Sequence, residues 1–381
     1  MIKIFYSSLV DFNKNNGPSV NEKTFINYFR NNKKHKLITF INIDIKEKNI
    51  ISYKLNQINS NSQILNWVYV RFFNLIKMIK ILYKEKPDYI VIRPAPLIFF
   101  QLLPLFFFKQ PLYLKTSGFF AFDGFYKKSM IRYLIYPINY FINKLMINRS
   151  LFVEVTGNDM KTIITKRYAV NSNKIVIVEN GFDDTLFNTK NEIQYNINNK
   201  FTVTYCGNFP SKRGGFFLID LVSKAKSRGI NILGNIVGGG IDEINKCKEY
   251  AILNNVDNQI NLQTEISFKK IPEILSNSNI GISMTMGSEV IACEQKVRQY
   301  FASGMHVISN TIGNKTHLEK TQGLYSDDLD KAIVFLENIK LMSNENYNIE
   351  RMKIKQYAET FLSNTLIMNK RLKLLKNGKI R

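Results

Sequence analysis

Short apolar runs alternate with longer amphipathic segments along the whole chain. Each apolar run ends in a polar or glycine-containing loop, which is typical of a buried strand in a parallel sheet. The segments between the runs place apolar residues at helical spacing. The predicted strands are Lys3–Ser8, Lys36–Asn42, Asp88–Arg93, Leu112–Lys115, Phe152–Gly157, Phe201–Cys206, Ile232–Val237, Ile260–Leu262, Ile280–Met284 and His306–Ser309. Strands that alternate with helices predict an α/β protein with doubly wound parallel sheets.

One segment, Asn279–Asn310, contains a complete strand–helix–strand unit. The strand Ile280–Met284 leads into a polar loop, the helix Lys296–Gly304 follows, and His306–Ser309 is the second strand. Gly304 stands where a helix C-terminus needs positive φ. Ligands of such sheets bind beyond the carboxyl ends of the strands. We therefore expect the polar loop and the N-terminus of the helix to face a ligand.

Two glycine-containing loops between a strand and a helix suggest phosphate binding. The first contains Gly17 and precedes the helix Glu22–Arg30. The second, Gly207–Gly215, carries the adjacent cations Lys212 and Arg213 just before a helix. Free N–H groups and the helix dipole at such a place bind anions, and a guanidinium neutralises them. The alternatives are an ordinary turn at Gly17 and a solvated turn at the second loop.

The composition indicates two globular domains in a reducing compartment. A length of 381 residues suits two hydrophobic cores, and a hydrophobic fraction of 45% is that of a folded chain. The cysteines Cys206, Cys247 and Cys293 are scattered and form no zinc-binding pattern, so we expect a cytoplasmic protein without a metal. An arginine and prolines interrupt the apolar stretch Ile90–Phe108, so no membrane-spanning helix is expected. The first apolar run is too short for a signal peptide.

The positive charge is concentrated in the first half of the chain. Residues 1–150 contain 23 Lys and Arg against 7 Asp and Glu, so they carry +16 of the total net charge of +23. This asymmetry indicates an anionic partner for the first half, such as a membrane surface, a nucleic acid or a phosphate-bearing substrate. A general gain in solubility is the alternative, but it does not explain why the halves differ.

Two aromatic, basic helical segments in the first half allow two interpretations. Ile64–Tyr83 is apolar nearly all round, with interspersed lysines, which indicates either full burial, the more usual arrangement, or contact with lipid headgroups. Phe119–Arg149 mixes aromatic and basic residues and is equally consistent with a core helix and with a membrane interface.

The segment Lys296–Ile308 resembles a known signature. Its sequence, KVRQYFASGMHVI, is similar to the nucleotide-binding motif Lys-Leu-x-Glu-Tyr-x-Ala-x-Gly-x-Pro-Val-Ile of the retaining group 1 (family four) glycosyltransferases with the GT-B fold. Gln299 replaces the glutamate that grips the donor ribose, and His306 replaces the proline. The second family glutamate, eight positions before Gln299, corresponds to Ile291, with Glu289 and Glu294 on either side.

A second resemblance marks the end of the first domain. Asn173–Phe187 resembles the family segment Lys-Ile-x-Val-Ile-x-Asn-Gly-Val-Asp-x-x-x-Phe, and a polar linker follows it. The resemblance implies two Rossmann-type domains facing each other across a cleft. Their expected bounds are residues 1–187 for the acceptor side and 188–350 for the nucleotide-sugar side. A basic C-terminal helix, 351–381, is expected to pack back on the first domain; the helix itself is predicted over Ile349–Leu375.

The resemblance also implies site residues. In the family pattern Gly-Arg-x-x-x-x-Lys-Gly, Arg213 takes the lysine position and Asn208 the arginine position, so Lys212 or Lys296 would supply the missing cation. The expected catalytic residues are Arg213, Lys212 and Glu294. The expected donor-binding residues are Gly17, Asn208, Gly214, Gly238, Glu289, Lys296 and Gln299. Ser117 and Gly118, in a loop where relatives carry a histidine, are expected on the acceptor side.

These residues lead to a functional hypothesis. The resemblance implies a retaining glycosyltransferase that moves a sugar from a nucleotide-diphosphate sugar to a lipid-linked or surface-glycan acceptor. Such an enzyme would act in O-antigen, capsule or lipopolysaccharide assembly at the inner face of a bacterial membrane. Beyond the nucleotide sugar we expect no cofactor, no metal and no nucleic-acid partner. The alternatives are a nucleotide-sugar 2-epimerase or hydrolase on the same fold, and an inactive relative that binds anions or membranes.

Overall fold

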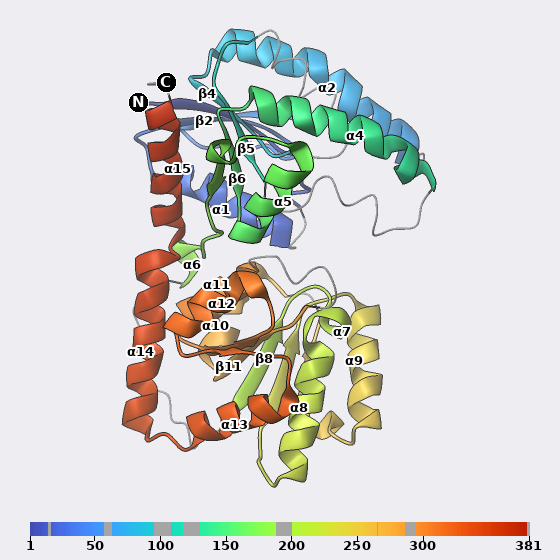
Figure 1. Cartoon of the computed structure of the whole chain (residues 1–381), viewed down its shortest axis with the longest axis vertical. Coiled ribbons are helices and arrows are strands. Elements are labelled where there is room, and N and C mark those ends of the chain that lie inside the picture. The colour runs from blue at the N-terminus through green and yellow to red at the C-terminus, as the bar shows by residue number, and fades with distance from the viewer. Residues whose placement is uncertain are drawn as a thin grey trace. The chain divides into compact units, whose positions relative to one another are not determined.

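The computed structural model describes residues 1–13, 17–56, 63–94, 108–116, 130–187, 200–264, 266–285 and 294–378. These residues form two compact units, each built on a parallel β-sheet (Figure 1). The first unit consists of Met1–Lys14, Pro18–Glu179 and Met368–Arg381, and the second mainly of Asn180–Ile367. The predicted class, an α/β protein with two doubly wound sheets, is confirmed.

The described part of the first unit contains a seven-stranded sheet. Across the sheet the order is β3 (Ile50–Lys54), β2 (Lys36–Ile41), β1 (Lys3–Ser7), β4 (Tyr89–Ile92), β5 (Leu112–Lys115), β6 (Phe152–Val155) and β7 (Ile175–Ile177). From β1 the chain moves outward to β2 and β3, then crosses back to β4 and continues in the other direction. The strand order therefore reverses between β1 and β4, the position where doubly wound sheets bind ligands.

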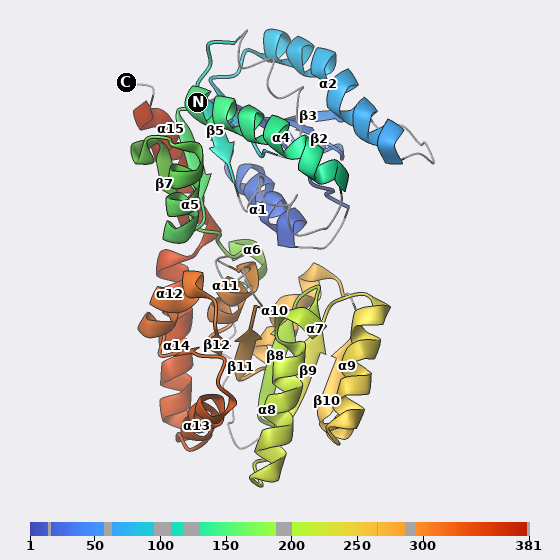
Figure 2. The same cartoon turned by 45° about the vertical axis from the view of Figure 1, so that its right-hand side comes forward.

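Helices cover both faces of this sheet. On one face lie α1 (Gly17–Asn31) and the later part of α15 (Asn364–Gly378), whose Met368, Leu372 and Leu375 share a buried core with α1 and β1. The helix α2 (Gln63–Glu85) crosses back from β3 to β4, and α4 (Met130–Arg149) and α5 (Asn158–Tyr168) connect β5 to β6 and β6 to β7. Right-handed crossovers place these helices on the opposite face, and Figure 2 shows α2 and α4 there, on the side away from α1.

The second unit has a six-stranded sheet within its described residues. The order is β10 (Ile260–Gln263), β9 (Leu233–Val237), β8 (Thr202–Cys206), β11 (Ile280–Ser283), β12 (His306–Ser309) and β13 (Leu324–Tyr325). One core packs α8 (Gly215–Ser227), α9 (Ile241–Leu253) and α13 (Leu329–Lys340). A second core packs α6 (Asp184–Phe187), α10 (Ile271–Ser276), α11 (Gln295–Ala302), α12 (Lys315–Lys320) and α14 (Asn344–Phe361). The reversal of strand order falls between β8 and β11.

The C-terminal helical segment differs from its prediction. A single helix over Ile349–Leu375 is wrong, because α14 ends at Phe361 and α15 begins at Asn364. The break has a long-range cause: the Phe182 N–H donates to the Leu362 carbonyl at 3.0 Å, and the Asn364 N–H donates to the Phe182 carbonyl at 3.1 Å. The expected packing of the last helix on the first unit is confirmed by the core residues of α15.

In the first unit the long stretch from Pro18 ends at Glu179, and the chain returns to this unit at Met368. The cause is that the segment around Phe182 pairs with the chain at Leu362–Asn364, so both segments belong to the second unit.

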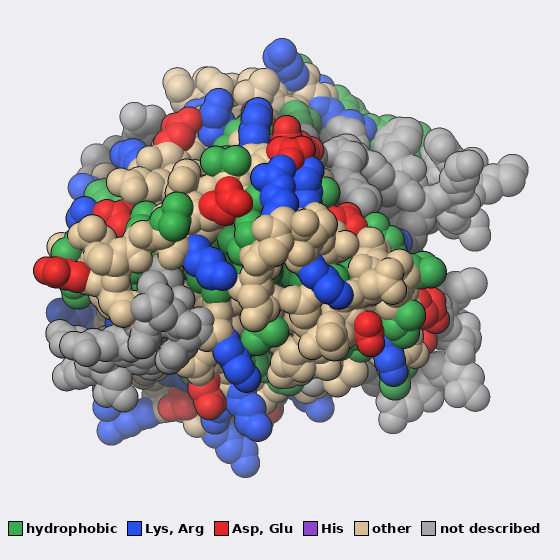
Figure 3. All heavy atoms as spheres, turned by 90° about the horizontal axis from the view of Figure 1, so that it is seen from below, with side chains coloured by type: hydrophobic (Ala, Val, Ile, Leu, Met, Phe, Trp, Pro, Cys, Tyr) green, Lys and Arg blue, Asp and Glu red, His purple; other side chains and the backbone are tan. Residues whose placement is uncertain are grey.

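Charged side chains of both signs occupy the face of the molecule in Figure 3, where they are interspersed with scattered hydrophobic side chains. On α8 and α13, Lys224 and Arg228 both bind Asp330, at 2.7 and 2.6 Å. None of the described helices combines the length and the apolar character that a membrane crossing requires.

Candidate functional site

The strands β8 and β11 of the second unit separate at the reversal of strand order, and a tyrosine hydroxyl fills the gap. Tyr300, on α11, accepts a hydrogen bond from the Cys206 N–H at 2.8 Å and donates one to the Ile282 carbonyl at 3.2 Å. A Cβ at Gly281 would lie 2.3 Å from the Tyr300 ring, so only glycine admits the ring here. The tyrosine thus holds open the carboxyl ends of two central strands, where ligands of this fold bind.

The loop after β8 turns sharply at Gly214. It contains α7 (Pro210–Arg213), and Gly214 then starts α8 with φ of 118°. Residues with a side chain rarely adopt this φ. A Cβ at this position would also lie 3.0 Å from Ile282 Cγ2 and 3.2 Å from the Met284 nitrogen. The glycine therefore lets the cationic loop lie directly against the end of β11.

Lys296 lies between the loop that follows β8 and the residues that follow β11. Its ammonium lies 3.4 Å from the Arg213 carbonyl oxygen, 3.6 Å from Glu294 Oε1 and 4.4 Å from the centre of the Tyr205 ring. Burial lowers the pKa of Lys296; the Glu294 carboxylate opposes this shift, and the Arg213 guanidinium adds to it. Lys296 is thus a cation held in place between a carboxylate, an aromatic face and a loop carbonyl.

Glu294 and Gln299 lie on either side of this lysine in the sequence. Glu294 immediately precedes the helix, and its carboxylate accepts a hydrogen bond from the Ser283 hydroxyl at the end of β11. Gln299 is buried on the same helix, α11.

The remaining predicted donor residues lie on neighbouring turns. Asn208 is half-buried directly after Gly207, and Lys212 is exposed on α7. Gly238, after β9, has φ of 102°, and a Cβ there would lie 2.6 Å from the Gly207 carbonyl oxygen. The turns after β8 and β9 are therefore packed against each other.

The structure thus brings some predicted residues together and not others. Arg213, Gly214, Glu294 and Lys296 meet at the ends of β8 and β11. Gly17 is the first residue of α1, the helix that follows β1 of the seven-stranded sheet. Glu289, Ser117 and Gly118 lie outside the described residues. Sequence reasoning missed Tyr300, although a glycine inside an apolar strand, here Gly281, signals a close approach by another group.

The site offers positive charge rather than a nucleophile. Burial raises the pKa of the Cys206 thiol to about 12, an effect that Lys296 opposes only in part, so the thiol is neutral at physiological pH. No group of three or more His, Cys, Asp and Glu that could hold a metal ion occurs in the part of the chain that the structure describes. Two cations and the N-termini of α8 and α11 suit the stabilisation of a developing anion.

The architecture is similar to that of solved glycosyltransferases. A glycosyltransferase from Rickettsia africae is 16% identical, with a TM-score of 0.72 over 99% of this chain and 98% of that chain. HepE from Anabaena, solved in complex with UDP and glucose, is 12% identical, with a TM-score of 0.71 over 99% and 100% of the two chains. WaaG, a glycosyltransferase involved in lipopolysaccharide biosynthesis, is 12% identical, with a TM-score of 0.65 over 96% and 98%. At these identities the similarity establishes the GT-B fold.

Comparison of the sequence alone gives no match: no family model and no curated protein corresponds to it.

Proposed function

We propose that the chain is a retaining glycosyltransferase that takes its sugar from a nucleotide-diphosphate donor. The donor would bind at the ends of β8 and β11. Lys296 and Arg213 would neutralise the departing diphosphate, the N–H groups at the start of α8 would bind its oxygens, and Gln299 would hydrogen-bond the ribose. Glu294 would bind sugar hydroxyls. Same-face transfer needs no dedicated base if the donor phosphate accepts the proton of the attacking hydroxyl.

One observation carries this proposal. The Lys296 side chain is only 11% exposed at the strand reversal, and its ammonium lies 3.6 Å from Glu294 Oε1 and 3.4 Å from the Arg213 carbonyl oxygen. Removing an ammonium from water costs free energy unless negatively charged groups nearby compensate its charge. A diphosphate at the carboxyl ends of β8 and β11 would be such a group. The structural neighbour solved with UDP and glucose supports the same class of ligand.

The acceptor part of the proposal rests on surface character. We propose a lipid-linked or surface-glycan acceptor, as in O-antigen, capsule or lipopolysaccharide assembly; the similarity to WaaG supports this choice. The described part of α2 is not fully buried: Phe73, Ile76 and Tyr83 are 58%, 60% and 61% exposed. On α4, Phe141 is 61% exposed. Exposed apolar side chains on a basic unit would suit a peripheral position at an anionic membrane.

The donor site is tested by nucleotide binding. Titration calorimetry with UDP, GDP, ADP and CDP would be performed on the wild type, Arg213→Gln, Lys296→Met and the control Lys248→Gln. Lys248 is an exposed cation on α9 of the same unit. We expect one diphosphate to bind, about tenfold more weakly in each of the two site variants, the loss of roughly one charge-assisted hydrogen bond. Equal binding by all four proteins would contradict the proposal.

The reaction type is tested by the anomeric configuration of the product. A retaining transfer gives a glycoside whose anomer matches the donor sugar, which nuclear magnetic resonance resolves. Turnover of the nucleotide sugar without any acceptor would instead favour the epimerase or hydrolase alternative.

The inactive alternative is tested at Gln299. A glutamate there would restore the family pattern and give a charged partner for the ribose. Activity in the wild type supports the proposal, whereas activity that appears only in Gln299→Glu identifies an inactive relative.

A further inference from the structure

The start of α11 carries two residues of the proposed donor site, Glu294 and Lys296. Glu294 immediately precedes the helix, but its side chain does not cap the N-terminus of α11. Side chains often provide such a cap, because the first N–H groups of a helix lack partners within it. Other contacts therefore position the start of α11, and one of them is made by Gln295, between the two site residues.

The later part of α11 is held by apolar packing, whereas its start is polar. Val297 and Phe301 are buried in the same hydrophobic core as Phe182. Gln295 and Lys296, the first two residues of the helix, are half-buried. Directional contacts such as hydrogen bonds orient polar side chains of this kind. The position of the first turn therefore depends on its polar contacts.

Gln295 makes such a contact with a distant part of the chain. Its Nε2 donates a hydrogen bond at 2.5 Å to the carbonyl oxygen of Gly181, which lies 114 positions earlier in the sequence. Gly181 is buried and belongs to the entry segment, residues 180–187, with which the chain passes into the second unit. The first turn of α11 is thus bonded to the backbone of the entry segment.

The entry segment is itself held at the junction of α14 and α15. The Phe182 N–H donates to the Leu362 carbonyl at 3.0 Å, and the Phe182 carbonyl accepts from the Asn364 N–H at 3.1 Å. The Asp184 carboxylate accepts from the N–H and the hydroxyl of Thr365, at 2.8 and 2.7 Å. Figure 1 shows α6, the last part of the entry segment, beside this junction. The segment is therefore tied to the junction at two places.

Gly181 brings the entry segment directly against the start of α15. A Cβ at Gly181 would lie 2.8 Å from Asn364 Cα and 2.9 Å from Asn364 N, closer than real Cβ atoms come. Only glycine therefore lets the backbone approach α15 in this way. Because Phe182 and Asp184 are bonded to the same junction, the Gly181 carbonyl is a fixed acceptor for Gln295.

We propose that Gln295 is a positioning residue of the donor site. Through Gly181 it holds the first turn of α11, and this keeps the Lys296 ammonium where the diphosphate of the donor would bind. The inference rests on the proposed function, because it gives Gln295 an effect on the cation that binds the donor. Gln295 acts through Lys296 and needs no contact of its own with the ligand.

The test is a double-mutant cycle on nucleotide binding by the full chain. Calorimetry with UDP, GDP, ADP and CDP is performed on the wild type, Gln295→Met, Lys296→Met and the double variant. Methionine resembles glutamine in length and has no N–H donor. Gln356→Met, at an exposed position of α14 in the same unit, is the matched control. We expect Gln295→Met to bind about fivefold more weakly, the loss of roughly one hydrogen bond, and the control to bind as the wild type does.

The cycle separates positioning from a general loss of stability. If Gln295 acts through Lys296, its substitution should change the affinity by less than about twofold once Lys296 is methionine. A merely structural role would lower the melting temperature and weaken binding by the same factor in both backgrounds. Equal affinity of the wild type and Gln295→Met, or an equal loss in both backgrounds, overturns the inference.

Hydrogen exchange gives a second readout. Coupling between two places in a protein is reciprocal, so a nucleotide that orders the start of α11 should also order the entry segment. We expect the nucleotide to slow exchange at the Phe182 and Asn364 amides, which bond within the junction, in the wild type but not in Gln295→Met. An equal response of these amides in the two proteins overturns the inference.

Two further outcomes are distinguishable. If circular dichroism shows that Gln295→Met does not fold, Gln295→Asn takes its place, because its amide is one methylene group too short to reach Gly181. A wild type that binds none of the four nucleotides refutes the proposed function and this inference with it. Nucleotide binding that does not depend on Gln295 refutes this inference alone.

Discussion

Glu154 and Arg371 lie 217 positions apart in the sequence and form a bidentate ion pair inside the first unit, with N–O distances of 2.8 and 2.7 Å. Glu154 belongs to β6 and Arg371 to α15, so the pair ties the C-terminal helix to the sheet. The side chains are 2% and 5% exposed. The contact therefore excludes water almost completely.

We expect each charge of this pair to depend on the other, because a single buried charge without its partner destabilises the folded first unit. Arg371→Met leaves a buried carboxylate unpaired and should lower the free energy of unfolding of the first unit by about 3–5 kcal/mol. The double variant Glu154→Met/Arg371→Met removes both charges and should be more stable than either single variant. Urea unfolding of all four proteins forms a double-mutant cycle. A double variant as unstable as the sum of the singles would mean that the two side chains act independently.

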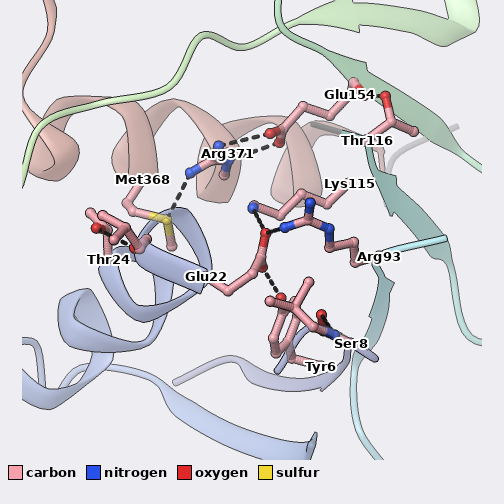
Figure 4. A network of polar contacts seen from close by, with 12 residues as sticks. Tyr6, Ser8, Glu22, Thr24, Arg93, Lys115, Thr116, Glu154, Met368 and Arg371 are labelled. Atoms are coloured by element: carbon pink, nitrogen blue, oxygen red, sulfur yellow. Dashed lines mark hydrogen bonds and ion pairs between the residues drawn. The ribbon is translucent and has the colours of Figure 1, made fainter. Parts of the chain in front are cut away.

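The carboxylate of Glu22 on α1 accepts hydrogen bonds from Lys115 Nζ at 2.6 Å and from Arg93 Nη1, as Figure 4 shows. Glu22→Gln removes the carboxylate that both cations bind inside the first unit and should lower the free energy of unfolding by about 3–5 kcal/mol. Arg93→Gln removes the more exposed of the two cations and keeps the Lys115–Glu22 ion pair, so it should cost less, about 1–2 kcal/mol. Thermal unfolding measures both. Similar losses for the two variants would contradict this ranking.

His306 predicts a pH dependence for the second unit. Neither ring nitrogen has a hydrogen-bond partner among the described residues, and the ring lies against Tyr347 and Phe335. Burial lowers the pKa of His306 to about 4; Arg351 adds to this, and Glu350 opposes it. The unfolded chain, with a histidine pKa near 6.5, binds the proton more readily between pH 6.5 and 4. Stability should therefore be complete above pH 6.5 and fall by about 3 kcal/mol toward pH 4.

The measurement is urea unfolding between pH 4 and 7.5. His306→Phe should remove most of the pH dependence in this range, and the same change at the half-buried His35 of the first unit should leave the second unit's dependence in place. An unchanged dependence in His306→Phe would assign it to other groups.

Gly214 and Gly229, at the two ends of α8, form a matched pair for testing the loop after β8. Both have positive φ, 118° and 72°, but a Cβ at Gly229 meets nothing within 4 Å, whereas one at Gly214 meets Ile282 and Met284. We expect Gly229→Ala to cost about 1 kcal/mol, from φ alone. Gly214→Ala should cost about 2–3 kcal/mol and also weaken nucleotide binding, because the loop must move away from β11. Melting temperatures and calorimetry compare the two variants. Equal effects of the two substitutions on stability and on nucleotide binding would show that the turn at Gly214 has no special role in binding.

The exposed side chains of α2 give a membrane prediction. Phe73→Ser/Ile76→Ser should weaken binding to vesicles of phosphatidylglycerol and phosphatidylcholine about tenfold, because two apolar side chains no longer enter the interface. Leu253→Ser/Leu341→Ser, which changes exposed leucines of the second unit, is the control. Co-sedimentation at two salt concentrations measures the binding. Equal loss of vesicle binding in both variants would show that the exposed side chains of α2 make no specific contact with the membrane.

Local sequence patterns predicted most strands of the two sheets. β5 and β12 occupy the predicted residues, because strands buried on both faces are continuous apolar runs. The edge strand β3, Ile50–Lys54, was missed, since it is half-buried and partly polar and follows a charged stretch. The break after Phe361 carries no local signal, because the backbone partner that causes it, Phe182, is far away in the sequence.

The same distinction applies to the sites. The cations Lys212 and Arg213 stand next to Gly214 and Gly215, and this spacing led sequence reasoning to predict an anion-binding loop. The polar cluster of Glu22, Arg93 and Lys115 was not found, because these residues are distant in the sequence and become neighbours only through the strand order. A charged residue closing an apolar run, as Lys115 does, was the signal that sequence reasoning did not use.

The discontinuity of the first unit has a consequence for biosynthesis. Nearly all of the second unit is one continuous stretch, Asn180–Ile367, whereas the first unit lacks its final helix until Met368–Gly378 has been translated. Domains usually complete their folding in the order of their synthesis. Here we expect the reverse order. The second unit completes its folding first on the ribosome. The first unit completes its folding only after Arg371 has been synthesised and can pair with Glu154.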